Sequence, residues 1–273
     1  MPSIALAQLT ALELSPPELI SVAAAAGYQQ AGVRLLPVAP GATAYPLMDD
    51  PAMLRETLAR MADTGVTIAD LEIVMLKPDT NVAAYLPFLE TGAQLGAKHV
   101  LVAAYDPEES RLVETFAAFC DAAAPFGLTG DLEFMPWTAV PDLASATRVV
   151  RAAARPNAGI LIDALHFDRS NSTISDIDAV PREWLHYWQL CDAPAEWPTT
   201  TEGLLHTART ERLFPGQGGI DLIALVQAMP SDLPISLEIP TLELARTVAA
   251  EERARWAMEH TKAVLAKASA ITR

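Results

Sequence analysis

The sequence predicts a single (β/α)8 barrel over residues 1–273. Short apolar segments alternate with longer segments of helical periodicity along the chain. Eight such apolar segments occur about 30 residues apart, a spacing typical of parallel strands that are each followed by a helix and close into a barrel. No linker divides the chain, and its length is ordinary for one α/β barrel domain.

The predicted strands are apolar runs bounded by turn residues. In chain order they are residues 4–7, 32–36, 65–73, 96–102, 130–134, 159–163, 185–190 and 234–239. Ser15 precedes Pro16 and Pro17, which places a capping residue and first-turn prolines at the start of the first helix. The later helices are predicted over residues 50–62, 83–95, 107–124, 141–154 and 244–268.

The alternative to a barrel is an open doubly wound sheet. That fold predicts a glycine-rich turn after the first strand. Residues 8–11, which follow the first predicted strand, contain no glycine. The barrel is therefore the favoured fold. Its longest irregular segment, residues 193–219, follows the seventh strand, on the side of a barrel where active sites are built.

The composition favours a small-molecule enzyme in the cytoplasm. The chain has 34 acidic and 19 basic residues, a net charge of −15, which is unfavourable for binding nucleic acid. No apolar run approaches the roughly 20 residues that span a bilayer, and the N-terminal residues do not resemble a secretory signal. Two cysteines are too few for a disulfide framework. We expect neither nucleic acid nor membrane as a partner, and a homo-oligomer is compatible with the sequence.

Four late strands end in a side chain that offers oxygen to a metal ion: Glu133, Asp163, Gln189 and Glu238. The C-terminal ends of barrel strands meet in one site. Apolar residues flank each carboxylate, so the charges are costly unless they are paired or bound to a cation. We expect one divalent metal ion here, Mn2+ first, with Mg2+, Co2+ and Zn2+ also open. The alternative is that each carboxylate caps a helix or pairs with a nearby arginine.

The run from Asp163 to Phe167 resembles the D-x-x-H motif of xylose isomerase-like barrels, the sugar-phosphate isomerase/epimerase superfamily. The glutamates of the fifth and eighth strands in that family correspond to Glu133 and Glu238, and its sixth-strand aspartate corresponds to Asp163. In the epimerases of the family these two glutamates abstract and return a proton on opposite faces of the substrate. The resemblance therefore implies that Glu133 and Glu238 are catalytic as well as metal ligands.

The seventh strand departs from the family pattern. The family usually has H-x-x-D there, whereas this chain has Gln189 and Asp192; hydroxypyruvate isomerase-like members also have Gln at that position. Further along, residues 212–218 resemble the family's R-x-x-P-G-x-G loop, whose arginine faces the substrate, although Gln217 stands where Glu is common. Asp192 is expected to support a ligand or a neighbouring loop.

Four side chains are candidates for binding substrate: His166, Arg212, His206 and Trp137. Each also has a structural alternative. His166 could support its loop, Arg212 could pair with the neighbouring Glu211, His206 could be solvated, and Trp137 could belong to the core. His99 and His186 lie early in their strands, toward the opposite end of the barrel, and are interpreted as structural.

A metal ion bound to a carbonyl and an adjacent hydroxyl acidifies the α-proton and stabilises the enediolate that forms. The predicted function is a metal-dependent isomerase or epimerase of a small ketose, keto acid or polyol-derived substrate. The alternative is a metal-dependent dehydratase, a lyase, of a keto-polyol or dehydroshikimate-like substrate, because a leaving group on the β-carbon diverts the carbanion to elimination.

Two other readings of the barrel use different chemistry. An apurinic-site endonuclease of the related family needs three metal ions and many histidines, and five histidines with a net charge of −15 fit that poorly. A barrel without catalysis, used for binding or assembly, is suggested by Gln189 and Gln217. Stoichiometric metal in the purified protein separates an enzyme from such a scaffold.

Overall fold

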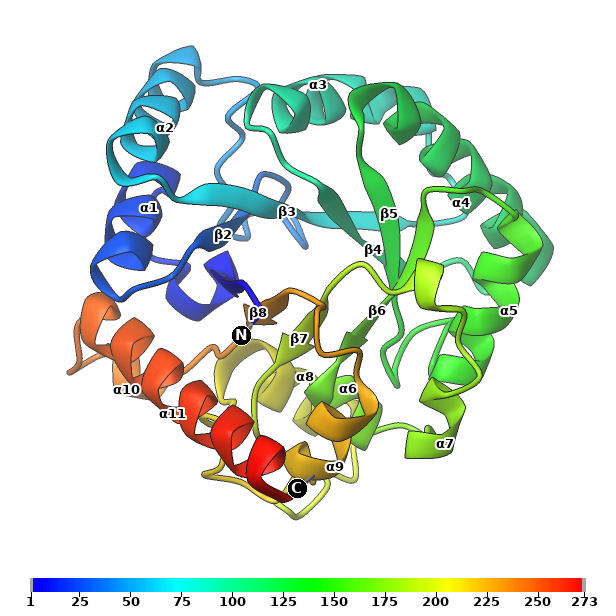
Figure 1. The fold of residues 1–273 in the computed structure, drawn as a ribbon. Coiled ribbons are helices and arrows are strands. Elements are labelled where there is room, and N and C mark those ends of the chain that lie inside the picture. The colour runs from blue at the N-terminus through cyan, green and yellow to red at the C-terminus, as the bar shows by residue number, and fades with distance from the viewer. Residues whose placement is uncertain (1, 272–273) are drawn as a thin grey trace.

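The computed structural model describes residues 2–271 and shows eight parallel strands closed into a barrel, with helices around its outside (Figure 1). Each strand pairs with the next one in the sequence, and β8 pairs with β1 to close the sheet. This confirms the predicted (β/α)8 barrel and excludes the open doubly wound sheet. The strands are β1 (Ile4–Leu6), β2 (Gln30–Arg34), β3 (Thr67–Leu76), β4 (His99–Ala104), β5 (Thr129–Glu133), β6 (Ala158–Asp163), β7 (Trp188–Leu190) and β8 (Ile235–Leu237).

Several helices begin at capping side chains that accept the free backbone N–H groups of the first turn. Asp50, for example, accepts hydrogen bonds from the N–H groups of Ala52 and Met53. The helices are α1 (Pro16–Ala25), α2 (Pro51–Thr64), α3 (Leu86–Gln94), α4 (Glu109–Ala123), α5 (Leu143–Ala153), α6 (Ala164–Asp168), α7 (Ile174–Ile177), α8 (Thr201–Thr210), α9 (Leu222–Ala228), α10 (Leu242–Ala245) and α11 (Ala250–Ile271).

The segment predicted to be irregular, residues 193–219, contains helix α8. Thr200 caps this helix by accepting a hydrogen bond from the N–H of Gly203. Only Ala208 of the helix is buried, so its sequence lacks the apolar periodicity by which helices are predicted. The prediction of an irregular segment was wrong at this point for that reason.

The helix predicted over residues 244–268 is two helices, α10 and α11. Residues 246–249 separate them. The buried side chain of Arg253 donates to the carbonyl oxygens of Val248, at 3.3 Å, and Thr10, at 2.9 Å. These bonds fix the start of α11 against the loop that follows β1, a long-range constraint that helical periodicity does not reveal.

The strand side chains divide into an outer and an inner set. Along β4, Val100 and Val102 pack in the large core shared with the helices, whereas Leu101 and Ala103 belong to a second cluster. Successive side chains of a strand point to opposite faces, so the second cluster lies inside the barrel. We call it the inner apolar layer, and its members are Ile73, Leu101, Ala103, Met135, Leu161 and Tyr187.

The same alternation directs polar side chains into the barrel at both ends. On β5, Leu132 packs in the outer core, so Asp131 and Glu133 on either side of it face the interior. Glu133 lies at the C-terminal end of the strand and Asp131 lies nearer the N-terminal end. Polar groups therefore lie at the two opposite ends of the barrel interior.

Gly159 of β6 lies beside Asp131 in the register of β5 and β6. A β-carbon at this position would lie 2.5 Å from Nδ1 of His186 and closer still to an oxygen of Asp131. We expect Gly159→Ala to lower the free energy of unfolding by about 1–3 kcal/mol, because overpacking forces neighbouring side chains aside. Urea unfolding followed by circular dichroism measures this change. An unaltered transition midpoint would contradict the close packing described.

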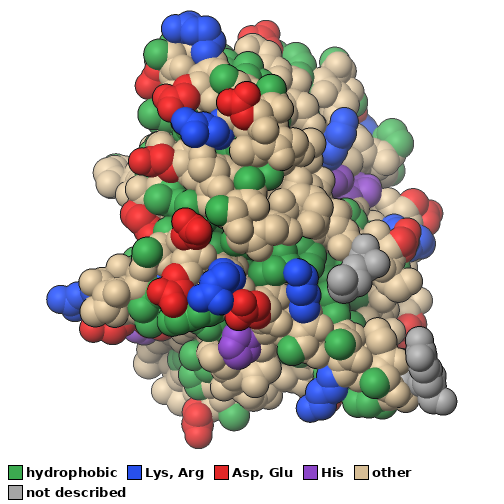
Figure 2. Space-filling model, turned by 60° about the vertical axis from the view of Figure 1, so that its left-hand side comes forward, with side chains coloured by type: hydrophobic (Ala, Val, Ile, Leu, Met, Phe, Trp, Pro, Cys, Tyr) green, Lys and Arg blue, Asp and Glu red, His purple; other side chains and the backbone are tan. Residues whose placement is uncertain are grey.

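Acidic and basic side chains are interspersed on the face of the molecule shown in Figure 2. No continuous basic patch covers the described residues of that face. Within residues 2–271, no helix combines the length and the apolar character needed to cross a membrane.

Candidate active site

Four oxygen-bearing side chains lie at the C-terminal ends of β5 to β8. They are Glu133 at the end of β5, Asp163 at the end of β6, Gln189 within β7 and Glu238 directly after β8. All four are buried, with at most 4% of each residue exposed. The four side chains predicted as metal ligands therefore lie at the same end of the barrel.

The amide of Gln189 lies against two of the carboxylates. With its nitrogen toward them, it donates to Oε1 of Glu133 at 3.0 Å and to Oδ2 of Asp163 at 3.1 Å. With its oxygen toward them, three oxygen atoms face one another, an arrangement that needs either a cation among them or a proton on one carboxyl group. The amide thus suits both a hydrogen-bonded state and a cation-bound state.

Arg212 provides a positive charge inside this carboxylate cluster. Its Nη1 donates to Oδ2 of Asp163 and its Nη2 donates to Oε2 of Glu238, each at 2.6 Å. Its Nε donates to the carbonyl oxygen of Ala208 at 3.0 Å, and the residue is 2% exposed. The structure pairs Arg212 with two of the predicted ligands rather than with its sequence neighbour Glu211.

Burial and mutual repulsion shift the pKa values of the three carboxylates in different directions. Burial, together with the charges of Glu238 and Asp163, raises the pKa of Glu133 well above its ordinary value. Burial raises the pKa of Glu238 to about 7, although Arg212 opposes the rise. Burial also opposes ionisation of Asp163, but the charge and hydrogen bond of Arg212, together with His166 and its backbone N–H, outweigh burial and lower that pKa. Two glutamates with raised pKa values therefore stand beside one aspartate whose pKa is lowered.

His166 lies in α6, where the predicted D-x-x-H motif turns from strand to helix. Its Nε2 lies 3.7 Å from Oε1 of Glu133, and its buried Nδ1 has no hydrogen-bond partner. Burial lowers the pKa of His166 to about 4, so the imidazole is neutral at neutral pH. The ring of Trp137 contacts that of His166 edge-on, with 5.1 Å between centroids. His166 is therefore held in place with one ring nitrogen free for a ligand.

A cavity of about 160 Å3 opens beside these residues. Its polar wall includes Glu133, His166, Arg212 and Glu238, and Trp137 forms part of the remaining wall. Most of the remaining lining is apolar and includes Leu9, Leu12, Val38, Ile73, Met75, Leu101 and Met135. The volume and the mixed lining suit a small molecule with both polar and apolar faces.

His206 does not line this cavity. It is exposed on α8, and its Nδ1 lies 3.0 Å from Oγ1 of Thr210. Arg209, one turn further along α8, lines the cavity instead. The helix that sequence analysis missed therefore explains why the two residues of this segment differ in position.

A buried ion pair between the last residue of β2 and the middle of β3 was missed by sequence analysis. Arg34 Nε donates to Oε2 of Glu72 at 2.9 Å, and Nη2 approaches the same oxygen to 2.6 Å. Oε1 of Glu72 is buried without a partner, and Arg34 lines the cavity. The signal was present: Glu72 lies between Leu71 and Ile73, the same flanking pattern as Glu133 and Glu238.

Asp192 fixes the loop that positions Arg212. Its Oδ2 accepts hydrogen bonds from the N–H groups of Gly216 and Gly218, each at 2.9 Å, and its Oδ1 accepts from Ala193 at 2.8 Å. Asp192 is 1% exposed. The second polar residue of the Gln189–Asp192 pair therefore supports a neighbouring loop.

Residues 20–264 match the family model described as the xylose isomerase-like TIM barrel. The chain belongs to this family. An inosose isomerase of Bacillus velezensis is 28% identical over 200 residues, which cover 68% of this chain and 69% of that protein. A 3-dehydroshikimate dehydratase of Pseudomonas aeruginosa is 31% identical over 136 residues, 48% of this chain but 21% of that protein.

Solved structures of the same fold superimpose on nearly the whole chain. A crystal structure of the IOLI protein with a bound zinc atom superimposes with a TM-score of 0.80 at 22% identity, covering 97% of this chain and 98% of that one. A D-allulose 3-epimerase from Methylomonas sp. in complex with D-allulose gives a TM-score of 0.69 at 16% identity, covering 96% of both chains. At these identities the likeness concerns the fold.

Proposed function

We propose that the protein is a metal-dependent isomerase of a small keto-polyol, with Glu133 and Glu238 as its acid and base. The observation that carries the proposal is that both carboxylates are buried and line the same small cavity. Burial raises the pKa of both carboxyl groups, that of Glu238 to about 7, which favours their use as general acids and bases. The relationship to inosose isomerases supports a polyol-derived ketone as the substrate class.

Glu133, Asp163, Gln189 and Glu238 would hold the metal ion. They fit this role because all four are buried, the Gln189 amide lies against the carboxylates of Glu133 and Asp163, and the Arg212 guanidinium bonds to both Asp163 and Glu238. Their donor set is oxygen only, which favours a hard ion, and Mn2+ is our first expectation ahead of Mg2+, Co2+ and Zn2+. When bound, the ion supplies Lewis-acid polarisation of the substrate's carbonyl and neighbouring hydroxyl oxygens.

The side chains of the chain divide the remaining work. One glutamate removes the proton from the carbon next to the carbonyl, and the other delivers a proton to the neighbouring position or opposite face. His166 offers its unpaired Nδ1 to a substrate hydroxyl. Arg212 offers its guanidinium to a substrate oxygen once it leaves Asp163 and Glu238. The apolar wall limits the water that reaches the reacting carbon.

Exchange of solvent deuterium into candidate substrates tests this function. The protein is incubated in D2O with Mn2+ and a panel of keto-inositols, ketohexoses and keto acids, and the carbon-bound protons are followed by NMR. We expect exchange next to the carbonyl, with conversion to an isomer, for at least one keto-polyol. No exchange in any of these compounds, with metal bound, would overturn the proposal.

The second candidate function is a dehydratase, favoured by the similarity to 3-dehydroshikimate dehydratases of Pseudomonas. The first step is the same, but loss of water from the β-carbon then replaces reprotonation. The product is more conjugated than the substrate, an enone from a keto-inositol or an aromatic ring from dehydroshikimate, and its ultraviolet absorption changes accordingly. Formation of an absorbing product from dehydroshikimate or a keto-inositol, without an isomer, would assign the lyase reaction instead.

Gln189→His is expected to shift the metal preference of the site. An imidazole ligand binds Zn2+ and Co2+ in preference to Mg2+, whereas an amide oxygen discriminates less between these ions. We expect the ratio of Zn2+ to Mg2+ affinity to rise at least tenfold, measured by titration calorimetry on metal-free protein. Gln94→His, at the exposed end of the outer helix α3, is the matched control and should leave the ratio unchanged. An unchanged ratio in Gln189→His would argue against Gln189 as a ligand.

A further inference from the structure

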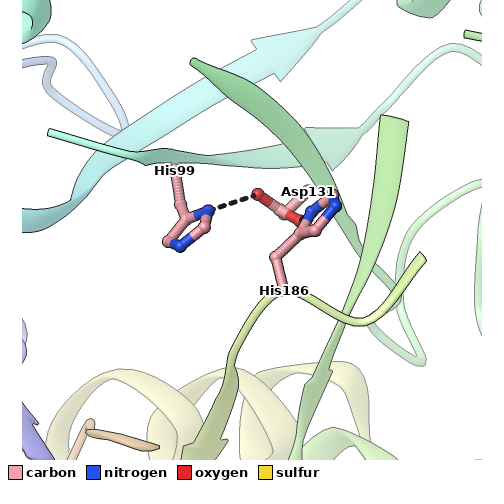
Figure 3. Close-up of side chains that lie close together, drawn as sticks. All are labelled: His99, Asp131 and His186. Atoms are coloured by element: carbon pink, nitrogen blue, oxygen red, sulfur yellow. Dashed lines mark hydrogen bonds and ion pairs between the residues drawn. The ribbon is translucent and has the colours of Figure 1, made fainter. Parts of the chain in front are cut away.

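Two histidines and an aspartate meet at the end of the barrel opposite the candidate active site. His99 begins β4, Asp131 lies on β5, and His186 lies in the loop just before β7 (Figure 3). Nδ1 of His186 lies 2.6 Å from Oδ1 of Asp131, and Nδ1 of His99 lies 3.7 Å from Oδ2. One donor atom from each residue can be chosen so that all lie within 4.8 Å of one another. The three side chains therefore lie close enough together to bind one ion.

The arrangement of the imidazoles is fixed by their surroundings. The two rings stack nearly parallel, with 8° between their planes and 5.7 Å between centroids. His99 is stacked in turn on Tyr187 of the inner apolar layer. Only a glycine leaves room for His186 beside Asp131, since a β-carbon at residue 159 would lie 2.5 Å from Nδ1 of His186. Both Nδ1 atoms are thus directed at the carboxylate by rigid packing.

Hydrogen bonds to neighbouring groups orient the two histidines, as is usual for histidines that bind a metal ion. The ring of His186 also bonds to the backbone of Glu183, which leaves Nδ1 for Asp131 or an ion. Oγ1 of Thr129 bonds to His99 at 2.8 Å and to Asp131 at 2.5 Å, adding a further oxygen beside the carboxylate. The side chain of Asp131 is fully buried, whereas His99 and His186 are 16% and 17% exposed. An ion can reach the imidazoles from solvent.

We propose that His99, Asp131 and His186 form a second metal site, separate from the active site, that binds a borderline divalent transition ion such as Zn2+. Two imidazoles and one carboxylate suit Zn2+, Co2+ or Ni2+ and are poor ligands for Mg2+ or Mn2+. The active site is richer in carboxylate oxygens, which suit Mg2+ and Mn2+ better than the second site does. The chain therefore has two sites of different chemistry at the two ends of one barrel. Because the second site joins three elements, its ion stabilises the fold.

Metal content and thermal stability of the whole protein test the proposal. Metal-free protein is titrated with Zn2+ in the presence of saturating Mn2+, and bound metal is counted by mass spectrometry after gel filtration. We expect about one Zn2+ per chain to bind with Mn2+ retained in the active site. At a Zn2+ concentration about 100-fold above the dissociation constant, the midpoint of thermal unfolding is expected to rise by roughly 5–10 °C.

His186→Gln and Asp131→Asn are the decisive variants. Each removes one ligand but keeps a group of similar size that can hydrogen-bond, and Asp131→Asn tests the site even where His186→Gln is unstable. We expect each to weaken Zn2+ binding at least tenfold and to abolish the rise in unfolding temperature, while Mn2+ content is unchanged. His260 is stacked on Phe214, outside the proposed site. His260→Gln is therefore the control for nonspecific zinc binding by a histidine, and it should behave as the wild type.

Three results would overturn the second site. The first is undiminished Zn2+ binding in both His186→Gln and Asp131→Asn. The second is loss of the Zn2+ only when Glu238 is replaced by glutamine, which would place the ion in the active site. The third is absence of Zn2+ binding once Mn2+ fills the active site. Failure of the proposed isomerase reaction alone leaves all three measurements unaffected, so the two proposals are tested separately.

Discussion

Replacing Glu133 by glutamine is expected to lower the rate of net isomerisation by about 10²- to 10⁴-fold, the usual contribution of a positioned acid or base. Glutamine keeps the size and an oxygen of the side chain but cannot accept the proton. Glu238→Gln should cause a loss of similar size. Because the two glutamates are proposed to serve different positions on the substrate, each variant should still exchange the proton of the one isomer that the remaining glutamate reaches.

The pattern of exchange separates catalysis from metal binding. Exchange of each isomer with D2O is followed by NMR for both variants, and their Mn2+ content is measured in the same samples. Glu114→Gln, on the outer helix α4, is the control and should be fully active. Equal loss of exchange from both isomers, with metal content halved or less, would mean that the glutamates act only as ligands.

Arg212→Met is expected to destabilise the metal-free protein by about 3–5 kcal/mol, because it leaves Asp163 and Glu238 buried without their shared positive partner. For a chain of this size the unfolding midpoint should fall by roughly 6–20 °C. Mn2+ should restore much of this loss, since the ion supplies the missing charge. The increase in unfolding temperature on adding Mn2+ should therefore be larger for Arg212→Met than for the wild type.

Thermal unfolding with EDTA and with Mn2+ measures both quantities. Arg209→Met is the matched control, because Arg209 is an exposed arginine of the same segment without a carboxylate partner in the described ion pairs. It should change stability by less than about 0.5 kcal/mol. Equal Mn2+ responses in Arg212→Met and in the wild type would show that the ion and the guanidinium do not share the same oxygens.

Sequence patterns were sufficient for the barrel because its strands are buried on both faces. Such strands appear as short, nearly continuous apolar runs, and the runs at residues 159–163 and 130–134 differ from β6 and β5 by about one residue. Helix α8 escaped prediction because it buries one residue of ten and so lacks an apolar stripe. Local capping by Thr200 formed it instead, and single capping residues are weak signals.

The part of the candidate site that lies at the strand ends could be predicted from the sequence. Four polar residues at equivalent positions on successive strands must meet in a barrel, so their grouping needed no structure. The position of Arg212 did not follow in the same way, because it depends on the loop held by Asp192. The exposed position of His206, away from the cavity, could not be predicted either, because it depends on helix α8. The pairing of Asp131 with His186 joins residues 55 positions apart and needed coordinates.

The alternation along β5 has one further consequence. Asp131 and Glu133 face the barrel interior on either side of Leu132, which packs outward against the helices. A shift of β5 by one residue would turn the side chains of Asp131 and Glu133 into the apolar core between the strands and the helices. It would also turn Leu132 into the barrel interior. The register of β5 is therefore fixed both by its two inward-facing acids and by its outward-facing leucine. Insertions or deletions within β5 are therefore expected to be poorly tolerated.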